Sequence, residues 1–283
     1  MSFKQYFGRV APTLAMVVLA ACGTPDLVNK PSPRLEQRIQ QETIVEDCMP
    51  HKYAVLINAV AGEPKWEADL SLAYQTLLEQ GFRRSDVYIL EGDEVDGRVY
   101  ETSFHPTDGA ATKKNIKRVF SHLQKKVKSD DLLFVYTSDH GERKEKIIDG
   151  RKSVTWTLLL NYDRLDQTEF TSYVAGLQPV RGIFLFEQCY GGGFAEKIGH
   201  DWNVAIAAAR PNEQSFSDFS DSFSHFFLLA FRDVKGSDSN QDGRVSIDEA
   251  VEYARQRHSY TIKGDQFPFI QSEIDPGTVF LSK

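Results

Sequence analysis

Residues 182–193 read GIFLFEQCYGGG, and this stretch decides the fold that we expect. Residues 183–186 form an unbroken apolar run, too short for a helix and typical of a strand buried on both faces of a parallel sheet. Glu187, Gln188 and Cys189 follow where this strand should end, and three glycines come after Tyr190. Ligands bind at this carboxyl edge of open α/β sheets, and glycines there allow close approach. We therefore expect Cys189 to be presented at the edge.

A second stretch repeats the pattern. Residues 131–141 read DLLFVYTSDHG, which predicts another buried strand, with His140 and Gly141 at its end. Taken alone, Cys189 is better interpreted as a small buried hydrophobe, since free cysteine is among the most buried residue types. A catalytic thiol needs a base, and that base can be remote in sequence. Two parallel strands that bring His140 and Cys189 to one edge favour catalysis.

The remaining pattern alternates strands with helices. Further strands are expected over residues 53–59, 87–90, 154–161 and 204–209, and helices over residues 63–80, from 112, over 168–177, 194–198 and 247–258. This alternation implies right-handed crossovers and an α/β fold: a mainly parallel central sheet between two helical layers. Residues 91–111 and 142–151 are expected to be polar loops, with His105 at the surface.

Composition limits the function further. The chain has 283 residues, of which 41% are hydrophobic and 26% charged, as expected of one globular domain with extensions. Its net charge of −7 argues against a nucleic-acid partner, because phosphates require clustered cations. The lysines of residues 113–128 are better explained as the solvated face of an amphipathic helix. No P-loop, Rossmann, GxSxG or HExxH motif is present.

The amino terminus has the pattern of a targeting segment. Lys4 and Arg9 precede an apolar run over residues 10–21, which ends in LAAC at Cys22. This ending resembles the lipobox of bacterial lipoproteins, which implies that residues 1–22 are a signal peptide and that Cys22 is lipidated. An ordinary secretory signal is the alternative. Residues 23–50 are expected to be a flexible tether and residues 51–283 the folded domain. We thus expect a cell-envelope protein, in the outer membrane of a Gram-negative host.

The chain holds three cysteines: Cys22, Cys48 and Cys189. With Cys22 lipidated, one possible pair remains, and joining Cys48 to Cys189 would block the thiol that we expect to be catalytic. Cys48 is therefore interpreted as structural or incidental, with a regulatory disulfide as the alternative.

The motifs SDHG (138–141), EQC (187–189) and VAIAAARPNEQSF (204–216) resemble the legumain-type cysteine peptidases of the caspase-like superfamily. The likeness covers about residues 53–231 and implies a caspase-like three-layer α/β/α sandwich. It also implies that His140 and Cys189 are the catalytic dyad and that the amides of Gly141 and Cys189 form the oxyanion hole. Glu187 matches the acidic residue of the family near the dyad.

The resemblance extends in part to the specificity pocket. Ser215 and Asp221 match positions that line this pocket in the family. Where asparaginyl-specific members carry an Arg-His pair, this chain has Lys65 and Trp66, so the resemblance does not imply cleavage after Asn. Asp221 has two possible roles, a helix N-cap or a pocket carboxylate, and Lys65 could neutralise it. Both pocket arrangements predict that acidic substrate residues are excluded.

Residues 238–249, DSNQDGRVSIDE, have the spacing of an EF-hand calcium loop. Glycine at position six permits the sharp turn, and the final glutamate can chelate with both oxygens. The expected ligands of a structural Ca²⁺ are Asp238, Asn240, Asp242, the main-chain carbonyl of Arg244, Ser246 and Glu249.

The sequence thus predicts a membrane-anchored cysteine endopeptidase that acts on protein or peptide substrates. Two alternatives stay open. The chain could be a non-catalytic, calcium-stabilised binding module, or it could use the same thioester as a transpeptidase or transamidase.

Overall fold

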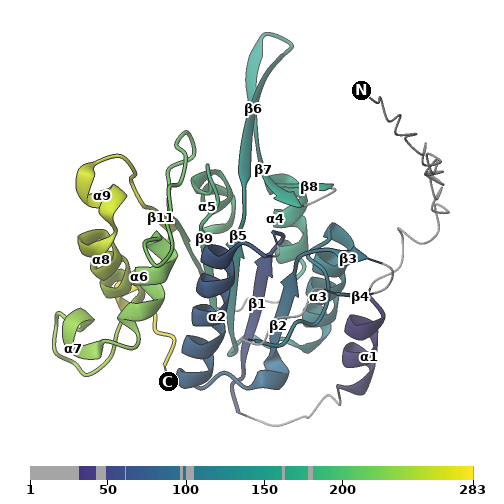
Figure 1. Ribbon diagram of the computed structural model, residues 1–283, viewed down its shortest axis with the longest axis horizontal. Helices are drawn as coiled ribbons and strands as arrows, with labels where there is room; N and C mark the ends of the chain where they lie inside the picture. The colour runs from purple at the N-terminus through teal and green to yellow at the C-terminus, as the bar shows by residue number, and fades with distance from the viewer. Residues whose placement is uncertain are drawn as a thin grey trace, which may run out of the picture. The chain divides into compact units, whose positions relative to one another are not determined.

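A six-stranded sheet forms the centre of the fold, with the strand order β11-β10-β9-β5-β1-β2 (Figure 1). The computed structural model describes residues 32–42, 49–60, 62–95, 98–99, 105–160, 163–177 and 181–282. Within these residues, the neighbouring strands from β10 to β2 pair in parallel, and only β11 at the edge is antiparallel. This arrangement confirms the predicted α/β class with a mainly parallel sheet.

The elements follow one another as the apolar runs predict. The strands are β1 (Lys52–Asn58), β2 (Val87–Glu91), β3 (Glu94–Val95), β4 (Arg98–Val99), β5 (Leu132–Ser138), β6 (Gly141–Ile148), β7 (Arg151–Leu160), β8 (Asp163–Asp166), β9 (Arg181–Phe186), β10 (Asn203–Ala207) and β11 (Phe269–Ser272). The α-helices are α1 (Pro33–Gln41), α2 (Pro64–Glu79), α3 (Lys113–Lys126), α4 (Gln167–Ala175), α5 (Gly192–Ile198), α6 (Phe223–Ala230), α7 (Val234–Ser237), α8 (Ile247–Arg257) and α9 (Ser259–Lys263).

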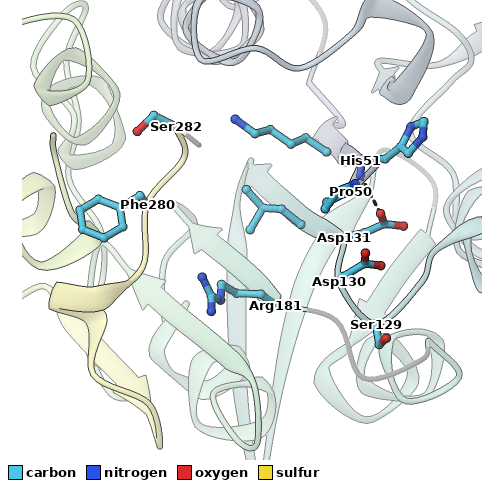
Figure 2. Close-up of a pocket in the computed structure, with 10 residues that line it drawn as sticks. Pro50, His51, Ser129, Asp130, Asp131, Arg181, Phe280 and Ser282 are labelled. Atoms are coloured by element: carbon cyan, nitrogen blue, oxygen red, sulfur yellow. Dashed lines mark hydrogen bonds between the residues drawn. The ribbon is translucent and has the colours of Figure 1, made fainter. Parts of the chain in front are cut away.

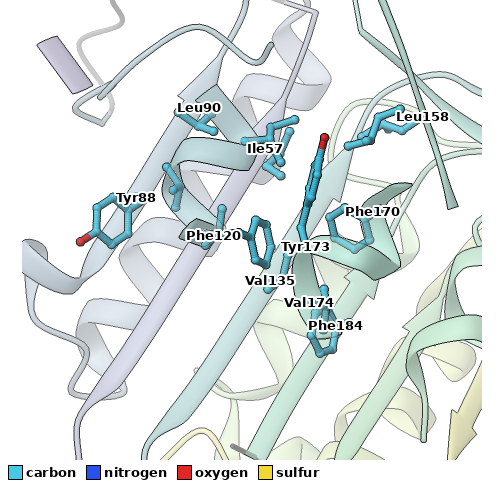
Figure 3. Packing of buried hydrophobic residues seen from close by; sticks show 14 of the residues in the cluster. Ile57, Tyr88, Leu90, Phe120, Val135, Leu158, Phe170, Tyr173, Val174 and Phe184 are labelled. Atoms are coloured by element: carbon cyan, nitrogen blue, oxygen red, sulfur yellow. The ribbon is translucent and has the colours of Figure 1, made fainter. Parts of the chain in front are cut away.

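Each face of the sheet has its own apolar core. Figure 3 shows part of one core, where Phe120 of α3 and Phe170 of α4 pack edge to face over strand residues such as Val135. The opposite core is formed by α2, α6 and α8 against the alternate residues of the same strands. Every residue of β1 and β2 is buried. Both strands are near-continuous apolar runs, which is the pattern expected for a sheet that is covered on both sides.

The predicted strand 154–161 exists, but it does not lie in the central sheet. It belongs to β7, which pairs with β6 as a long antiparallel hairpin and with β8 in a separate three-stranded sheet. Asp149 and Gly150 form the turn with φ of 49° and 72°, the left-handed pair that two-residue hairpins need. The expected polar loop 142–151 is thus a hairpin that rises away from the sheet (Figure 1).

The predicted flexible tether also needs correction over residues 32–42. Helix α1 lies in this segment, and its Leu35 is fully buried in the core beside α3. Glu36 accepts hydrogen bonds from Arg118 at 2.5 and 2.9 Å, and Arg38 forms an ion pair with Asp108. These contacts fix the helix to the domain, and residues 31–283 form one compact unit.

The predicted signal peptide, Cys22 and Cys48 lie outside the described residues. Of the helices within the described part, none combines the length and the apolar character that crossing a membrane requires.

Candidate active site

The two predicted catalytic residues follow neighbouring strands. Strands β5 and β9 pair in parallel, with Thr137 opposite Phe186 in the register, so Asp139–His140 and Glu187–Cys189 leave the sheet at one edge. The amide of Glu187 donates to the carbonyl of Thr137 at 2.9 Å, and the Thr137 hydroxyl donates to Gln188 at 2.7 Å. These bonds hold the two chain segments together just before the candidate residues.

Cys189 is half-buried and carries a free thiol. Its Sγ lies 3.4 Å from the amide nitrogen and 3.5 Å from the carbonyl oxygen of Ser215, on the loop after β10. Burial raises the pKa of the Cys189 thiol, and the nearby Glu187 acts in the same direction, while amide donors from Ser215 and Gly141 oppose them. The resting sulfur is therefore a thiol, which needs a base at the moment of attack.

Gly141 lies directly against the main chain of Cys189. A Cβ atom at position 141 would overlap the carbonyl oxygen of Cys189, so only glycine fits. The amides of Gly141 and Cys189 both lie close enough to the sulfur to influence its pKa. Amide donors from two separate segments thus lie near the sulfur, as stabilisation of an oxyanion there would require.

His140 is exposed, and its ring meets the ring of Trp66 edge-on with 5.0 Å between centroids. Trp66 is buried in α2, so it forms a fixed support for a histidine that is otherwise open to solvent. The described part of the chain contains no hydrogen bond between His140 and Cys189. Such contacts are often long before substrate binds.

Glu187 is buried beneath Cys189 instead of facing solvent. It accepts hydrogen bonds from the Ser224 amide at 2.8 Å and the Ser215 hydroxyl at 3.4 Å. Burial and the charge of Asp69 raise the pKa of Glu187 to about 8. Glu187 therefore connects the loop of Ser215 to α6, and this connection sets the position of the segment that contacts the thiol.

The predicted pocket residues Lys65 and Asp221 have other partners. The Lys65 ammonium donates to the Ser217 carbonyl at 3.4 Å and lies 4.8 Å from the Trp66 ring centroid. Asp221 accepts from the Ser259 amide at 3.1 Å, at the start of α9, and the N-cap of α6 is Ser222. The geometry brings Ser215 to the thiol and joins Lys65 to the same loop, while Asp221 caps a neighbouring helix.

The three glycines after Cys189 have a different role from the one that the sequence suggests. A Cβ atom on Gly192 would meet Pro211, and one on Gly193 would meet the ring of Trp156 in β7. The Trp156 indole also donates to the Pro211 carbonyl at 2.6 Å. These glycines permit close packing of the turn against β7 and the loop after β10.

Some residues at this edge were missed by sequence reasoning. Asp139 is buried, accepts from the His140 amide, and has its pKa raised to about 7 by burial. His105, expected at the surface, is also buried, with its Nε2 at 3.6 Å from the carboxylate of Glu91. His105 lies in no recognisable motif, and Asp139, although it belongs to the SDHG motif, was given no role by the sequence. The buried edge of the sheet is the only signal that could have indicated them.

The loop of residues 238–249 lies between α7 and α8. Gly243 has the expected positive φ of 85°. Asp238 accepts from the amides of Asp242 at 3.1 Å and Gly243 at 2.8 Å, and the Glu249 carboxylate accepts from Asn240 and Ser246. No group of three or more His, Cys, Asp or Glu side chains in the described residues is arranged around a metal position.

The cavity of Figure 2 lies far from this edge. It has a volume of about 380 Å³ and is lined by residues at the amino ends of the strands, such as Lys52, Leu132 and Arg181. Because His140 and Cys189 follow the carboxyl ends of the same strands, this cavity lies on the opposite edge of the sheet.

A sequence model described as the peptidase C13 family matches residues 52–267. A search of curated proteins gives no match. Among solved structures, the crystal structure of a Geobacter sulfurreducens protein is similar, with a TM-score of 0.57 and 16% sequence identity over 82% of this chain and 97% of that chain. At this identity the likeness concerns the fold alone.

Proposed function

The chain belongs to the peptidase C13 family and is therefore a cysteine-type peptidase; from this premise we propose that it is an endopeptidase that uses Cys189 and His140. One observation carries the proposal. The thiol of Cys189 accepts from the Ser215 amide at 3.4 Å and is influenced by the amide of Gly141, at the edge where His140 leaves the neighbouring strand.

In the proposed mechanism the sulfur of Cys189 attacks the scissile carbonyl carbon. Because burial keeps the resting sulfur protonated, His140 takes the proton as the bond forms. The amides of Gly141 and Cys189 stabilise the oxyanion, and His140 then gives its proton to the leaving amine. Water hydrolyses the thioester that remains on Cys189, which restores the free thiol.

The decisive test replaces Cys189 by Ala. Hydrolysis of peptide substrates and labelling by thiol-directed electrophiles should be lost, with little change in the unfolding midpoint. His140→Ala should have a similar effect on hydrolysis. The matched control is His200→Ala, since His200 is exposed and precedes β10 at the opposite edge of the sheet. Activity that survives intact in Cys189→Ala would overturn the dyad, whereas a wild-type protein that neither cleaves peptides nor reacts at Cys189 would point to the non-catalytic binding module.

For specificity, we propose that acidic side chains are excluded before the scissile bond. Two carboxyl groups, Glu187 and Asp69, are already buried close together beneath Ser215, and Asp221 lies six residues beyond Ser215. A carboxylate of the substrate would be desolvated beside these groups, and the cation that contacts this loop, Lys65, already donates to the Ser217 carbonyl. A fluorogenic peptide library tests this, and efficient cleavage after Asp would contradict it.

We further propose that the loop of residues 238–249 binds one Ca²⁺ as a structural clamp. Its side chains are oxygen donors, which suit a hard cation, and Gly243 adopts the turn that such a loop requires. The candidate ligands are Asp238, Asn240, Asp242, Ser246 and Glu249, together with the Arg244 carbonyl. The ion would hold α8 against α6 and contribute stability, not chemistry.

Membrane attachment through Cys22 is likewise a proposal, and it rests on the LAAC sequence and the apolar run before it. It implies a location in the cell envelope. Incorporation of radiolabelled fatty acid into the wild-type chain, and its loss in Cys22→Ser, would support this attachment. Incorporation that persists in Cys22→Ser would overturn it.

A further inference from the structure

The hairpin of β6 and β7 ends in an apolar tip. Ile147 is 81% exposed and Ile148 is 55% exposed, directly before the turn at Asp149 and Gly150. Strand β6 pairs only with β7, so the far half of the hairpin has no cover from the rest of the described chain. Figure 1 shows this hairpin standing clear of the sheet. Two adjacent isoleucines at such a place imply a partner, because their exposure to water is unfavourable.

The tip is also cationic. Residues 143–152 contain five Lys or Arg side chains and two acidic ones, whereas the whole chain has a net charge of −7. Glu145 is paired with Arg143 and Lys152, which leaves Lys146 and Arg151 beside the isoleucines with no ion pair among the described residues. The local charge is thus opposite to that of the protein as a whole, and it fits an anionic partner.

The arrangement of these side chains favours a lipid layer over a flat protein surface as the partner. Successive residues of a strand point to opposite faces, so Ile147 and Ile148 project to opposite sides of the hairpin. Lys152 lies across from Ile147, while Arg151 lies across from Ile148 and Lys146 shares that face, so each face carries one isoleucine and at least one cation. A flat protein surface would cover one face only. A fluid layer that surrounds the tip covers both.

We propose that the tip of the hairpin inserts into the interface of a membrane with anionic lipids. Ile147 and Ile148 enter the boundary between headgroups and acyl chains, and the cations of both faces contact the lipid phosphates. Strand β6 begins at Gly141, directly after His140, so this contact turns the edge that carries the candidate active site toward the membrane. The proposal depends neither on lipidation of Cys22 nor on peptidase activity.

The test is co-sedimentation with lipid vesicles. The chain of residues 31–283 serves for it, because it forms one compact unit with both cores and lacks the proposed anchor. Its binding to phosphatidylglycerol vesicles is compared with binding to phosphatidylcholine vesicles, at low and high salt. The test variant is Ile147→Ser/Ile148→Ser. The matched control is Ile262→Ser on α9, since Ile262 is 63% exposed but lies away from the hairpin.

We expect binding to phosphatidylglycerol that weakens with salt, and a loss of about tenfold or more in the double variant. The control should bind like the parent chain, and a short peptide substrate should be cleaved by all three proteins equally. Absence of vesicle binding, or binding that is equal in the double variant, overturns the proposal.

Discussion

Gly141 and Cys189 touch through their main chains, although 47 positions separate them in the sequence. The contact places the amide that follows His140 next to the candidate nucleophile, because β5 and β9 are neighbours. A side chain at position 141 would have to push these segments apart.

Gly141→Ala should therefore lower peptidase activity by about a hundredfold, since small displacements of catalytic groups have effects of this size. The backbone of Gly141 does not have a positive φ, so alanine is excluded by contact and not by conformation. Kinetics and a thermal melt of the purified variant test this. A fully active variant would show that the close contact between residues 141 and 189 is not required for catalysis.

Trp66 should affect turnover through His140. Trp66→Leu keeps an apolar side chain in α2 but removes the edge-on contact at 5.0 Å, so we expect kcat to fall roughly two- to tenfold. Trp66→Phe should retain most of the activity. Trp202→Leu is the control, since Trp202 is exposed and not in contact with His140. A change in KM alone would indicate that Trp66 contacts the substrate instead.

Glu91 should make stability depend on pH. Burial raises the pKa of Glu91 from 4.5 to about 7, against the hydrogen bond from Asn58. Above pH 4.5 the unfolded chain loses this proton while the folded chain keeps it, so the free energy of unfolding falls as the pH rises to about 7. Glu91→Gln should reduce this fall. Urea unfolding at pH 5 and pH 8 measures it.

The control for this experiment is Glu79→Gln, because Glu79 is an exposed carboxylate that pairs with Arg232. It should change stability by a similar small amount at both pH values. If Glu91→Gln behaves in the same way, Glu91 ionises in the folded protein as easily as it does in the unfolded chain.

Calcium should stabilise the fold through the loop of residues 238–249. At a hundred times its Kd, Ca²⁺ should add about 2.7 kcal/mol to the free energy of unfolding. Asp242→Asn should lose most of this gain, while its oxygen can still accept from the Arg244 amide. Asp248→Asn, within the loop but at no ligand position, should keep the gain. Equal melts with Ca²⁺ and with a chelator would rule out the site.

Hydrogen bonds lower the pKa of Glu249 to about 2 although burial acts in the opposite direction, with Ser246 and Asn240 as donors. Glu249 thus contributes stability above its usual pKa, and that stability is lost as the pH falls toward 2. Even without an ion, Glu249→Gln should be less stable than the parent at neutral pH and should approach it near pH 2. Thermal melts in chelator across this range measure the difference.

The sequence was most informative where a strand is buried on both faces. The runs before His140 and before Cys189 are continuous apolar segments, so their strands and their common edge could be predicted. The hairpin of β6 and β7 could have been found from Asp149-Gly150, a strong turn signal. Residues 142–151 carry charges and two exposed isoleucines instead of the alternation that a half-buried strand shows. For this reason the segment was predicted as a polar loop.

Other features depend on contacts between distant segments. Helix α1 is mostly polar, and it is fixed by Leu35 and by partners about eighty positions away, such as Arg118 for Glu36. His105 is buried because Glu91 and the sheet edge cover it, which no local pattern indicates. The support of His140 by Trp66 could not be foreseen for the same reason, since it joins α2 to the end of β5.

Because α1 packs against the domain, the linker between the proposed lipid anchor and the folded domain is shorter than the sequence suggests. For a chain anchored at Cys22, the free length ends at Ser32, where the packed helix begins, and not at residue 50. Ten residues reach at most about 35 Å when fully extended. A peptidase with so short a linker would reach only substrates that lie close to the surface of its own membrane. Its substrates would then be selected by height above the bilayer as well as by sequence.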